Sequence, residues 1–228
     1  NAIFEAAIEN DLCYKNPAKR STYRSTAQKH IKHVLSDEQM ETVKAYAADR
    51  MPEVVLLLET GLRRGELVGL MWSDIDMDEK TLRVRRSMVL RDKVVTANPP
   101  KWNSYRTLPL SDEAMALIRT LPHDSLYVFP NENGAPHCPN SWSQKLKRLM
   151  RKLHAEHIEI PVVTAHGLRH TYGTYLRRHG ADIYTIQKLL GHKDINVTAE
   201  IYVHNELDTL RNVLTSINPT SEETDTAL

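Results

Sequence analysis

The chain lacks several features that would assign it to a special class of protein. Two cysteines among 228 residues, Cys13 and Cys138, cannot build a disulfide framework, and a reducing, intracellular setting fits them best. No apolar run approaches the roughly 20 residues that a membrane helix requires, so we expect no membrane partner. The start of the chain has neither the apolar segment of a signal peptide nor an initiator Met. We therefore expect a cytoplasmic protein and a piece of a longer chain.

An overall excess of one charge is also missing, because the net charge is only +1. The charges are nevertheless separated along the chain. Residues 81–106 carry seven bases and one acid, and residues 141–152 carry five bases and no acid. Bases clustered on a balanced chain favour a localised anionic partner such as a nucleic acid, and a solvated charged face is the alternative.

Helix signals recur along the chain and predict a mostly α fold. Ser36 and Gln39 form a capping-box pattern that predicts a helix to about Arg50. An apolar helix should follow from about Pro52 and stop at Gly61. Further helices are expected over residues 2–12, 66–71, 111–121, 140–154 (capped by Asn140 or Ser141), 166–179, 182–190, 197–202 and, as an amphipathic tail, 207–217.

Short β-prone runs interrupt these helices. Leu82 with Val84, and residues 88–90, 94–95 and 107–108, form short β-prone runs that are separated by turns. They predict a small antiparallel sheet of about three strands. The expected fold class is therefore mostly α with a small antiparallel β-sheet (α+β).

Arginines and an acid at a helix junction form the first polar cluster. Arg63 and Arg64 follow the apolar helix, and Glu66 stands three residues after Arg63. A guanidinium at such a junction can bind a phosphate through two N–H groups, while the acid holds the guanidinium in place. A surface salt bridge is the plainer alternative.

Histidines flank an arginine in the second cluster. His166, Arg169 and His170 share one face of a helix. A zinc-protease motif would need Glu directly after the first histidine, where Gly167 stands, and the arginine would repel a cation. We therefore expect no metal here and favour a phosphate.

Two further segments carry isolated reactive groups. Leu190, Gly191 and His192 are followed, ten residues after His192, by Tyr202. Lys101 lies in a segment expected to form a hairpin. Taken singly, such a tyrosine is usually a packing residue and such a lysine is usually solvated.

Together and in this order, the clusters resemble the tyrosine recombinases, also called phage-type integrases. The matching segments are TGLRRGEL, a lysine-bearing hairpin ending in RTLPL, then HGLRHT, LLGH and IYVH, spread over roughly residues 36–215. The resemblance implies the fold of a tyrosine recombinase or type IB topoisomerase catalytic domain. The implied catalytic residues are Arg63, Lys101, His166, Arg169, His192 and Tyr202, and the implied supporting residues are Glu66 and His170.

The residue types suit the implied chemistry. Arginines can stabilise charge on the non-bridging oxygens of a phosphodiester, and the phenol of Tyr202, which is a weak nucleophile while protonated, could lose its proton to His166. Lys101 could protonate the leaving 5′ oxygen. The product would be a phosphotyrosine at a DNA 3′ end, formed without metal, ATP or another cofactor.

The resemblance also implies how the chain is divided. Residues 1–20 would be the end of a core-binding domain, 21–35 a linker, 36–204 the catalytic domain, and 205–228 a C-terminal helix and tail. The tail could dock on a neighbouring protomer of a tetramer or fold back on its own chain.

Several partners follow from the same resemblance. The principal one is double-stranded DNA with specific recombination sites, in a bacterial cytoplasm and at the nucleoid during action. An accessory DNA-bending or excision factor is also expected. The residues of the motifs favour an integrase of a phage or conjugative mobile element. The expected DNA-contacting bases are Arg85, Arg86, Lys145, Lys147 and Arg148.

Three other functions remain open at the level of sequence. A type IB topoisomerase would use the same tyrosine chemistry to relax DNA without exchanging partners. A non-catalytic DNA-binding protein would use the same residues as phosphate contacts only. A metal-dependent nuclease would draw on the eleven histidines and would fail in a chelator.

Overall fold

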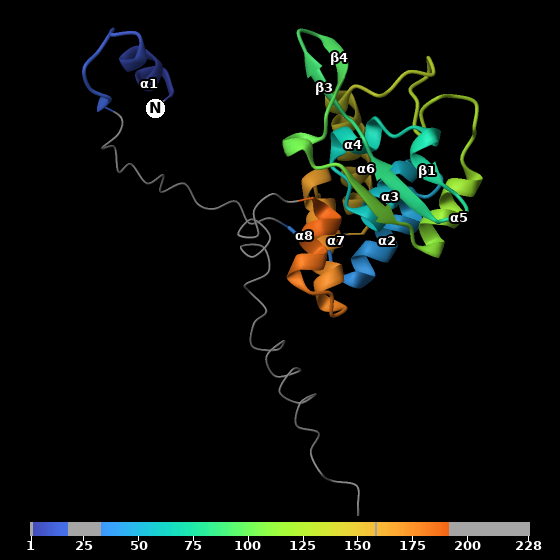
Figure 1. Ribbon diagram of the computed structural model, residues 1–228. Helices are drawn as coiled ribbons and strands as arrows, with labels where there is room; N and C mark the ends of the chain where they lie inside the picture. Colours follow the sequence, from blue (N-terminus) through green and yellow to red (C-terminus); the bar gives the residue numbers. More distant parts are fainter. Residues whose placement is uncertain (1, 18–32, 158, 192–228) are drawn as a thin grey trace, which may run out of the picture. The chain divides into compact units, whose positions relative to one another are not determined.

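The computed structural model describes residues 2–17, 33–157 and 159–191 (Figure 1). Residue contacts divide the chain into two units, Asn1–Lys32 and His33–Leu228. In the first unit the described part holds helix α1 (Ala2–Glu9), which ends before the predicted Leu12. Leu35 is fully buried in the core of the second unit. Within the described residues, no helix combines the length and apolarity needed to cross a bilayer.

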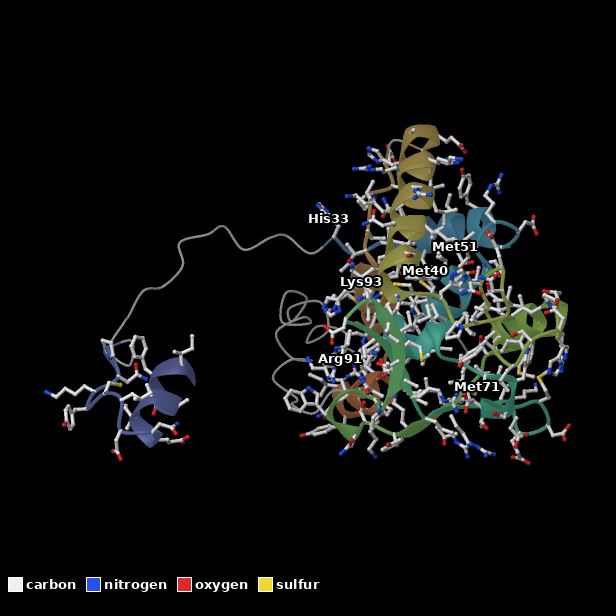
Figure 2. All side chains as sticks on the ribbon, turned by 90° about the horizontal axis from the view of Figure 1, so that it is seen from above. His33, Met40, Met51, Met71, Arg91 and Lys93 are labelled. Atoms are coloured by element: carbon white, nitrogen blue, oxygen red, sulfur yellow. The ribbon has the colours of Figure 1, made fainter. Side chains whose placement is uncertain are left out.

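A central helix organises the second unit. Helix α3 (Pro52–Thr60) is apolar on all sides, so it must be covered on all sides. It contacts α2 (Asp37–Ala47), α5 (Asp112–Thr120) and α7 (Ala165–Arg178). Figure 2 shows Met40 and Met51 among these helices, where both are buried.

Most predicted helices of the second unit are present, and their caps explain where they begin. The side chain of Ser36 accepts from the backbone N–H of Gln39, and the side chain of Gln39 accepts from the backbone N–H of Ser36. The predicted capping box is therefore confirmed. Ser111 caps α5 by accepting from the backbone N–H of Ala114, and Asp182 caps α8 (Ile183–Leu190) by accepting from the backbone N–H groups of Tyr184 and Thr185.

Three helix starts differ from prediction. Helix α4 covers Arg64–Val68, two residues earlier than expected. Helix α6 (Pro139–Glu156) begins at a proline, which suits a first helical position because its missing N–H would be unpaired there. Thr164 accepts from the N–H of Gly167 and so starts α7 at Ala165.

The strands form two small sheets instead of the single predicted one. Strands β1 (Ile75–Asp76), β2 (Thr81–Val84) and β5 (Arg106–Pro109) form an antiparallel sheet in the order β1-β2-β5. Strands β3 (Ser87–Arg91) and β4 (Val94–Asn98) form a separate hairpin, which projects from the body of the unit in Figure 1.

The hairpin has a two-residue turn that its backbone angles explain. Asp92 and Lys93 have φ values of 48° and 66°, as a turn of type I′ requires at both central positions. Arg91 and Lys93, labelled in Figure 2, bring two positive charges to this turn. Short 3-10 turns, η2 (Trp72–Asp74) and η3 (Lys101–Asn103), precede β1 and β5.

Gly61 lets α3 end against α7 and α8, and this close approach generates a prediction. Its φ is +61°, and a Cβ there would lie 2.4 Å from Tyr172 Cδ1 and 2.7 Å from Leu190 Cδ2. We expect Gly61→Ala to lower the free energy of unfolding by about 1–2 kcal/mol for the left-handed backbone and about 1–3 kcal/mol more for overpacking.

Gly134→Ala is the matched control for this prediction. Gly134 also has a positive φ, +74°, but nothing lies within 4 Å of its added Cβ. Urea unfolding monitored by circular dichroism should therefore show the backbone cost alone for Gly134→Ala. Equal losses for the two variants would contradict the close packing at Gly61.

Candidate active site

A cleft of about 1160 Å³ gathers the predicted residues of the described chain. Its walls come from the start of α4, strand β3, turn η3, helix α6 and the start of α7. Arg63, Lys101, His166 and Arg169 all line it, although they are spread over more than 100 residues of sequence. The fold therefore brings together the four described members of the predicted catalytic set.

Arg63 stands at the N-terminal end of α4 and is held from three directions. Its Nη1 donates to Glu66 Oε1 at 2.8 Å and to Ser104 Oγ at 3.0 Å. Its Nη2 donates to the carbonyl of Gly191 at 2.6 Å. Its side chain remains 22% exposed, so the held guanidinium still reaches the cleft.

Glu66 is the buried anion of the site. Its side chain is 1% exposed and accepts from the backbone and side chain of Arg63 and from both Nη atoms of Arg106. Burial alone would raise the pKa of Glu66, but the hydrogen bonds and charges of Arg106 and Arg63 outweigh it and lower that pKa. Glu66 is therefore a carboxylate that holds two arginines in place.

Arg106 is a site residue that the sequence interpretation did not single out. It belongs to the RTLPL segment and is 8% exposed at its side chain. Besides binding Glu66, its Nε donates to the carbonyl of Leu189 at 2.9 Å. The sequence signal available was its position, as the last base of the basic stretch and the first residue of a short apolar strand.

Arg169 lies on α7 and is almost fully buried, with 3% of the residue exposed. Its Nη1 donates to the carbonyl of Gly61 at 2.6 Å, and its Nη2 donates to the carbonyl of Leu190. Both acceptors are at helix C-terminal ends, where carbonyls lack helical partners and carry partial negative charge. The ends of α3 and α8 thus orient this guanidinium.

His166 and His170 form a pair beside Arg169. Their Nε2 atoms are 2.7 Å apart, and their rings meet edge to face with centroids 4.1 Å apart. In this hydrogen bond one ring nitrogen donates and the other accepts. The described residues contain no cluster of three or more metal-binding side chains, whereas the His–His–Arg grouping suits an anion.

Lys101 is on the turn η3 between β4 and β5, and not at the turn of the β3–β4 hairpin. Its side chain is exposed, and its Nζ lies 5.5 Å from the ring centroid of Trp102. Trp102 and Asn103 both have positive φ, 64° and 52°, which L-residues seldom adopt. Two residues in a strained backbone conformation thus directly follow Lys101, which lines the cleft.

The predicted DNA-contacting bases separate into two groups. Lys145, Lys147 and Arg148 are exposed on α6, Lys147 lines the cleft, and Arg85 is exposed after β2. Arg86 differs, because its guanidinium binds both carboxylate oxygens of Asp74, which is itself buried. This internal ion pair holds the guanidinium of Arg86 in place, and the contact of Arg86 with DNA remains a prediction.

Part of the predicted site lies outside the described residues. His192, the nucleophile Tyr202, the helix 197–202 and the tail 205–228 belong to this part. Gly191, the last described residue before them, ends α8 with φ +65°. The roles assigned to these residues remain predictions.

Comparison with known proteins bears on the family. The model of the phage integrase family matches residues 28–208, which is most of the chain. The chain belongs to the phage integrase family. Its relatives include a tyrosine recombinase XerC-like protein of Caldanaerobacter subterraneus subsp. tengcongensis, 30% identical over 89% of this chain and 59% of that protein. The transposase from transposon Tn916 of Enterococcus faecalis is 27% identical over 97% of this chain and 60% of that protein.

A solved structure agrees with this phage integrase assignment. The Tn1549 transposon integrase in complex with transposon right end DNA has a TM-score of 0.77 and 26% identity, over 95% of this chain and 76% of that chain. The expected fold of a tyrosine recombinase catalytic domain is thereby confirmed. The chain spans about three fifths of the length of the curated relatives.

The buried carboxylate of Glu66 generates a prediction about stability. Glu66→Gln should lower the free energy of unfolding at pH 7 by about 3–5 kcal/mol, because two arginines lose their charge partner. Since the pKa of Glu66 is lowered from its ordinary value of 4.5, this difference should be present above pH 4.5 and shrink as the pH falls below it.

Urea unfolding at a series of pH values measures this effect. Glu113→Gln is the matched control, because Glu113 is half-exposed and contacts Lys44 at 3.1 Å. It should change stability by at most about 1 kcal/mol. A loss for Glu66→Gln that stays constant into acid would show that its carboxylate charge contributes nothing.

Proposed function

We propose that this phage integrase family member cleaves and rejoins DNA strands in site-specific recombination, through a covalent 3′-phosphotyrosyl intermediate. The observation that carries the proposal is the convergence of Arg63 and Arg169 on one cleft that Lys101 and His166 also line. A phosphodiester resists attack because its oxygens are negative, and fixed cations at those oxygens relieve this.

Arg63 and Arg169 have the geometry of a preorganised phosphate clamp. Both guanidinium groups are fixed by carboxylate or carbonyl oxygens before any DNA arrives. They need little rearrangement when negative charge grows on the non-bridging oxygens. Removing one such donor from a site of this kind costs about 100- to 1000-fold in rate.

The remaining residues supply proton transfers. The Tyr202 oxygen attacks phosphorus, its proton passes to His166, and the bond from phosphorus to the 5′ oxygen breaks. Lys101 protonates that 5′ oxygen, which leaves as a hydroxyl. In the reverse direction a 5′ hydroxyl of another strand attacks the phosphotyrosine, so rejoining needs no external energy source.

Tyr172 is a second tyrosine near the arginines, and its surroundings argue against it as nucleophile. It packs beside Gly61, and burial together with the charge of Glu59 raises its pKa to about 12. A phenol this reluctant to ionise is a poor attacking group. Tyr202 is therefore the better assignment.

DNA is the partner that the charged surface and the relatives favour. Lys147 lines the cleft, and Lys145 and Arg148 are exposed on the same helix α6, so this helix offers positive charge to a phosphate backbone. The Tn1549 integrase, similar in fold, was solved on transposon right end DNA. Recombinase and transposase relatives favour strand exchange over topoisomerase-type relaxation, and the proton donors lining the cleft favour catalysis over DNA binding alone.

The biological setting is proposed on the same grounds. The transposase relatives favour a mobile genetic element, acting in the cytoplasm at the bacterial nucleoid. Assembly as a tetramer through residues 205–228, and an accessory DNA-bending or excision factor, remain sequence-based expectations.

Covalent trapping tests the proposed function. The chain is incubated in EDTA, without ATP, with a pool of nicked duplexes whose sequence is randomised around the nick, and adducts are separated on denaturing gels. We expect an adduct that disappears with Tyr202→Phe. A chain that fails to bind the pool at low salt, or binds it without forming an adduct, would contradict the proposal.

The salt dependence of DNA binding tests the α6 surface. Lys147→Gln should make the negative slope of log K against log salt shallower by about 1, because one phosphate contact and its released counterion are lost. Lys80→Gln is the control of equal charge, since the exposed Lys80 pairs with Asp112 at 2.7 Å. Equal slopes for wild type and Lys147→Gln would remove α6 from the interface.

A further inference from the structure

Arg106 binds parts of three elements of the site at once. Its Nη1 and Nη2 reach the two oxygens of Glu66 at 3.1 and 2.8 Å, and its Nε reaches the carbonyl of Leu189 at 2.9 Å. Its Nη1 also lies 3.3 Å from the carbonyl of Ser104. The side chain of Arg106 is 8% exposed, and Arg106 is not among the residues that line the cleft.

Each of these acceptors is connected, by a hydrogen bond or along the backbone, to a group that binds or presents a residue expected to act on DNA. Glu66 holds Arg63. Ser104 ends the turn that presents Lys101, and its hydroxyl accepts from Arg63. Leu189 is in the last turn of α8, directly before the carbonyls that orient the two arginines of the clamp.

The end of α8 therefore binds three arginines through consecutive carbonyls. Leu189 accepts from Arg106, Leu190 from Arg169, and Gly191 from Arg63. Such carbonyls lack helical partners and lie at the negative end of the helix dipole, so guanidinium groups suit them. A shift of this helix end would move both members of the phosphate clamp.

We propose that Arg106 is a positioning residue that sets the placement of Arg63 relative to Arg169 by joining Glu66 to the C-terminal end of α8. The inference rests on the proposed function, in which those two arginines hold the scissile phosphate. Arg106 itself touches neither the phosphate nor the attacking group in this account. It acts through the groups that it binds.

The backbone at Gly191 is fitted to this arrangement. A Cβ at Gly191 would lie 3.0 Å from Arg106 Nη1 and 3.2 Å from its Cδ and Cζ. Glycine also accepts the φ of +65° at this position without steric cost. The end of α8 can thus close on the arginine, directly before His192 in the sequence.

The shape of the guanidinium matters as much as its charge. One planar fork meets both oxygens of Glu66 while Nε turns to the helix end, which a single ammonium group cannot reproduce. Lysine at position 106 would keep a cation beside Glu66 and lose the bridge to Leu189. The two contributions can therefore be separated by substitution.

Rates of adduct formation at saturating DNA test the inference, using the most reactive duplex recovered from the randomised pool. We expect Arg106→Gln to slow cleavage about 10- to 100-fold, as misplaced catalytic groups do, while the Kd for that duplex changes less than about twofold. Arg106→Lys should recover part of the rate. Lys44→Gln is the matched control, because Lys44 is an equally buried cation whose ion pairs are with Glu41, Glu59 and Glu113, none of which is a proposed site residue.

The pH profile supplies a readout that loss of stability would not produce. The charged groups that contact Glu66 in the described part are Arg63, at the start of α4, and Arg106, on β5. Without Arg106 the pKa of Glu66 should rise. As the pH is lowered, the cleavage rate of Arg106→Gln should therefore begin to decline at a higher pH than the rate of wild type does. Arg106→Lys should keep the wild-type acid limb.

The outcomes distinguish this inference from the proposed function. No adduct with the wild-type chain would overturn the proposed function itself. An adduct formed at the wild-type rate and with the wild-type pH profile by both Arg106 variants would overturn the positioning role alone. An equal slowing by Lys44→Gln would do the same, and Arg106→Lys serves the test if Arg106→Gln does not fold.

Discussion

A buried carboxylate between two arginines is the interaction on which the rest of the site depends. Glu66 is withdrawn from water, where an isolated carboxylate would be strongly disfavoured, and Arg63 and Arg106 keep it charged. The same contacts fix the direction of both guanidinium groups. A cation aimed at a phosphate must be held by something other than that phosphate, and here a buried anion supplies the hold.

Helix ends extend this arrangement to Arg169. The carbonyls at the ends of α3 and α8 need hydrogen-bond donors, and Arg169 provides them for Gly61 and Leu190. Glycines make the approach possible, because Gly61 and Gly191 both adopt positive φ, and a Cβ would collide with Tyr172 and Leu190 at Gly61 and would contact Arg106 tightly at Gly191. Stability and function are thus served by the same bonds, since the groups that end the helices also orient the phosphate clamp.

Local signals in the sequence predicted much of the fold. The capping box at Ser36 and the buried helix ending at Gly61 depend on neighbouring residues, and both are confirmed. The bridge made by Arg106 depends on contacts between residues 40 to 83 positions apart, and the pairing of β2 with β5 joins residues such as Thr81 and Pro109, which are distant in sequence; local patterns encode neither. The ion pair of Arg86 with the buried Asp74 is likewise a contact of the fold that charge along the sequence does not reveal.

The central claim is that these arginines serve a phosphoryl transfer to Tyr202. Digesting a trapped protein–DNA adduct with nuclease and protease, then sequencing the modified peptide by mass spectrometry, tests it most directly. The account predicts a nucleotide joined through its 3′ phosphate to the Tyr202 oxygen. A nucleotide on any other residue, or a 5′ linkage, would contradict it.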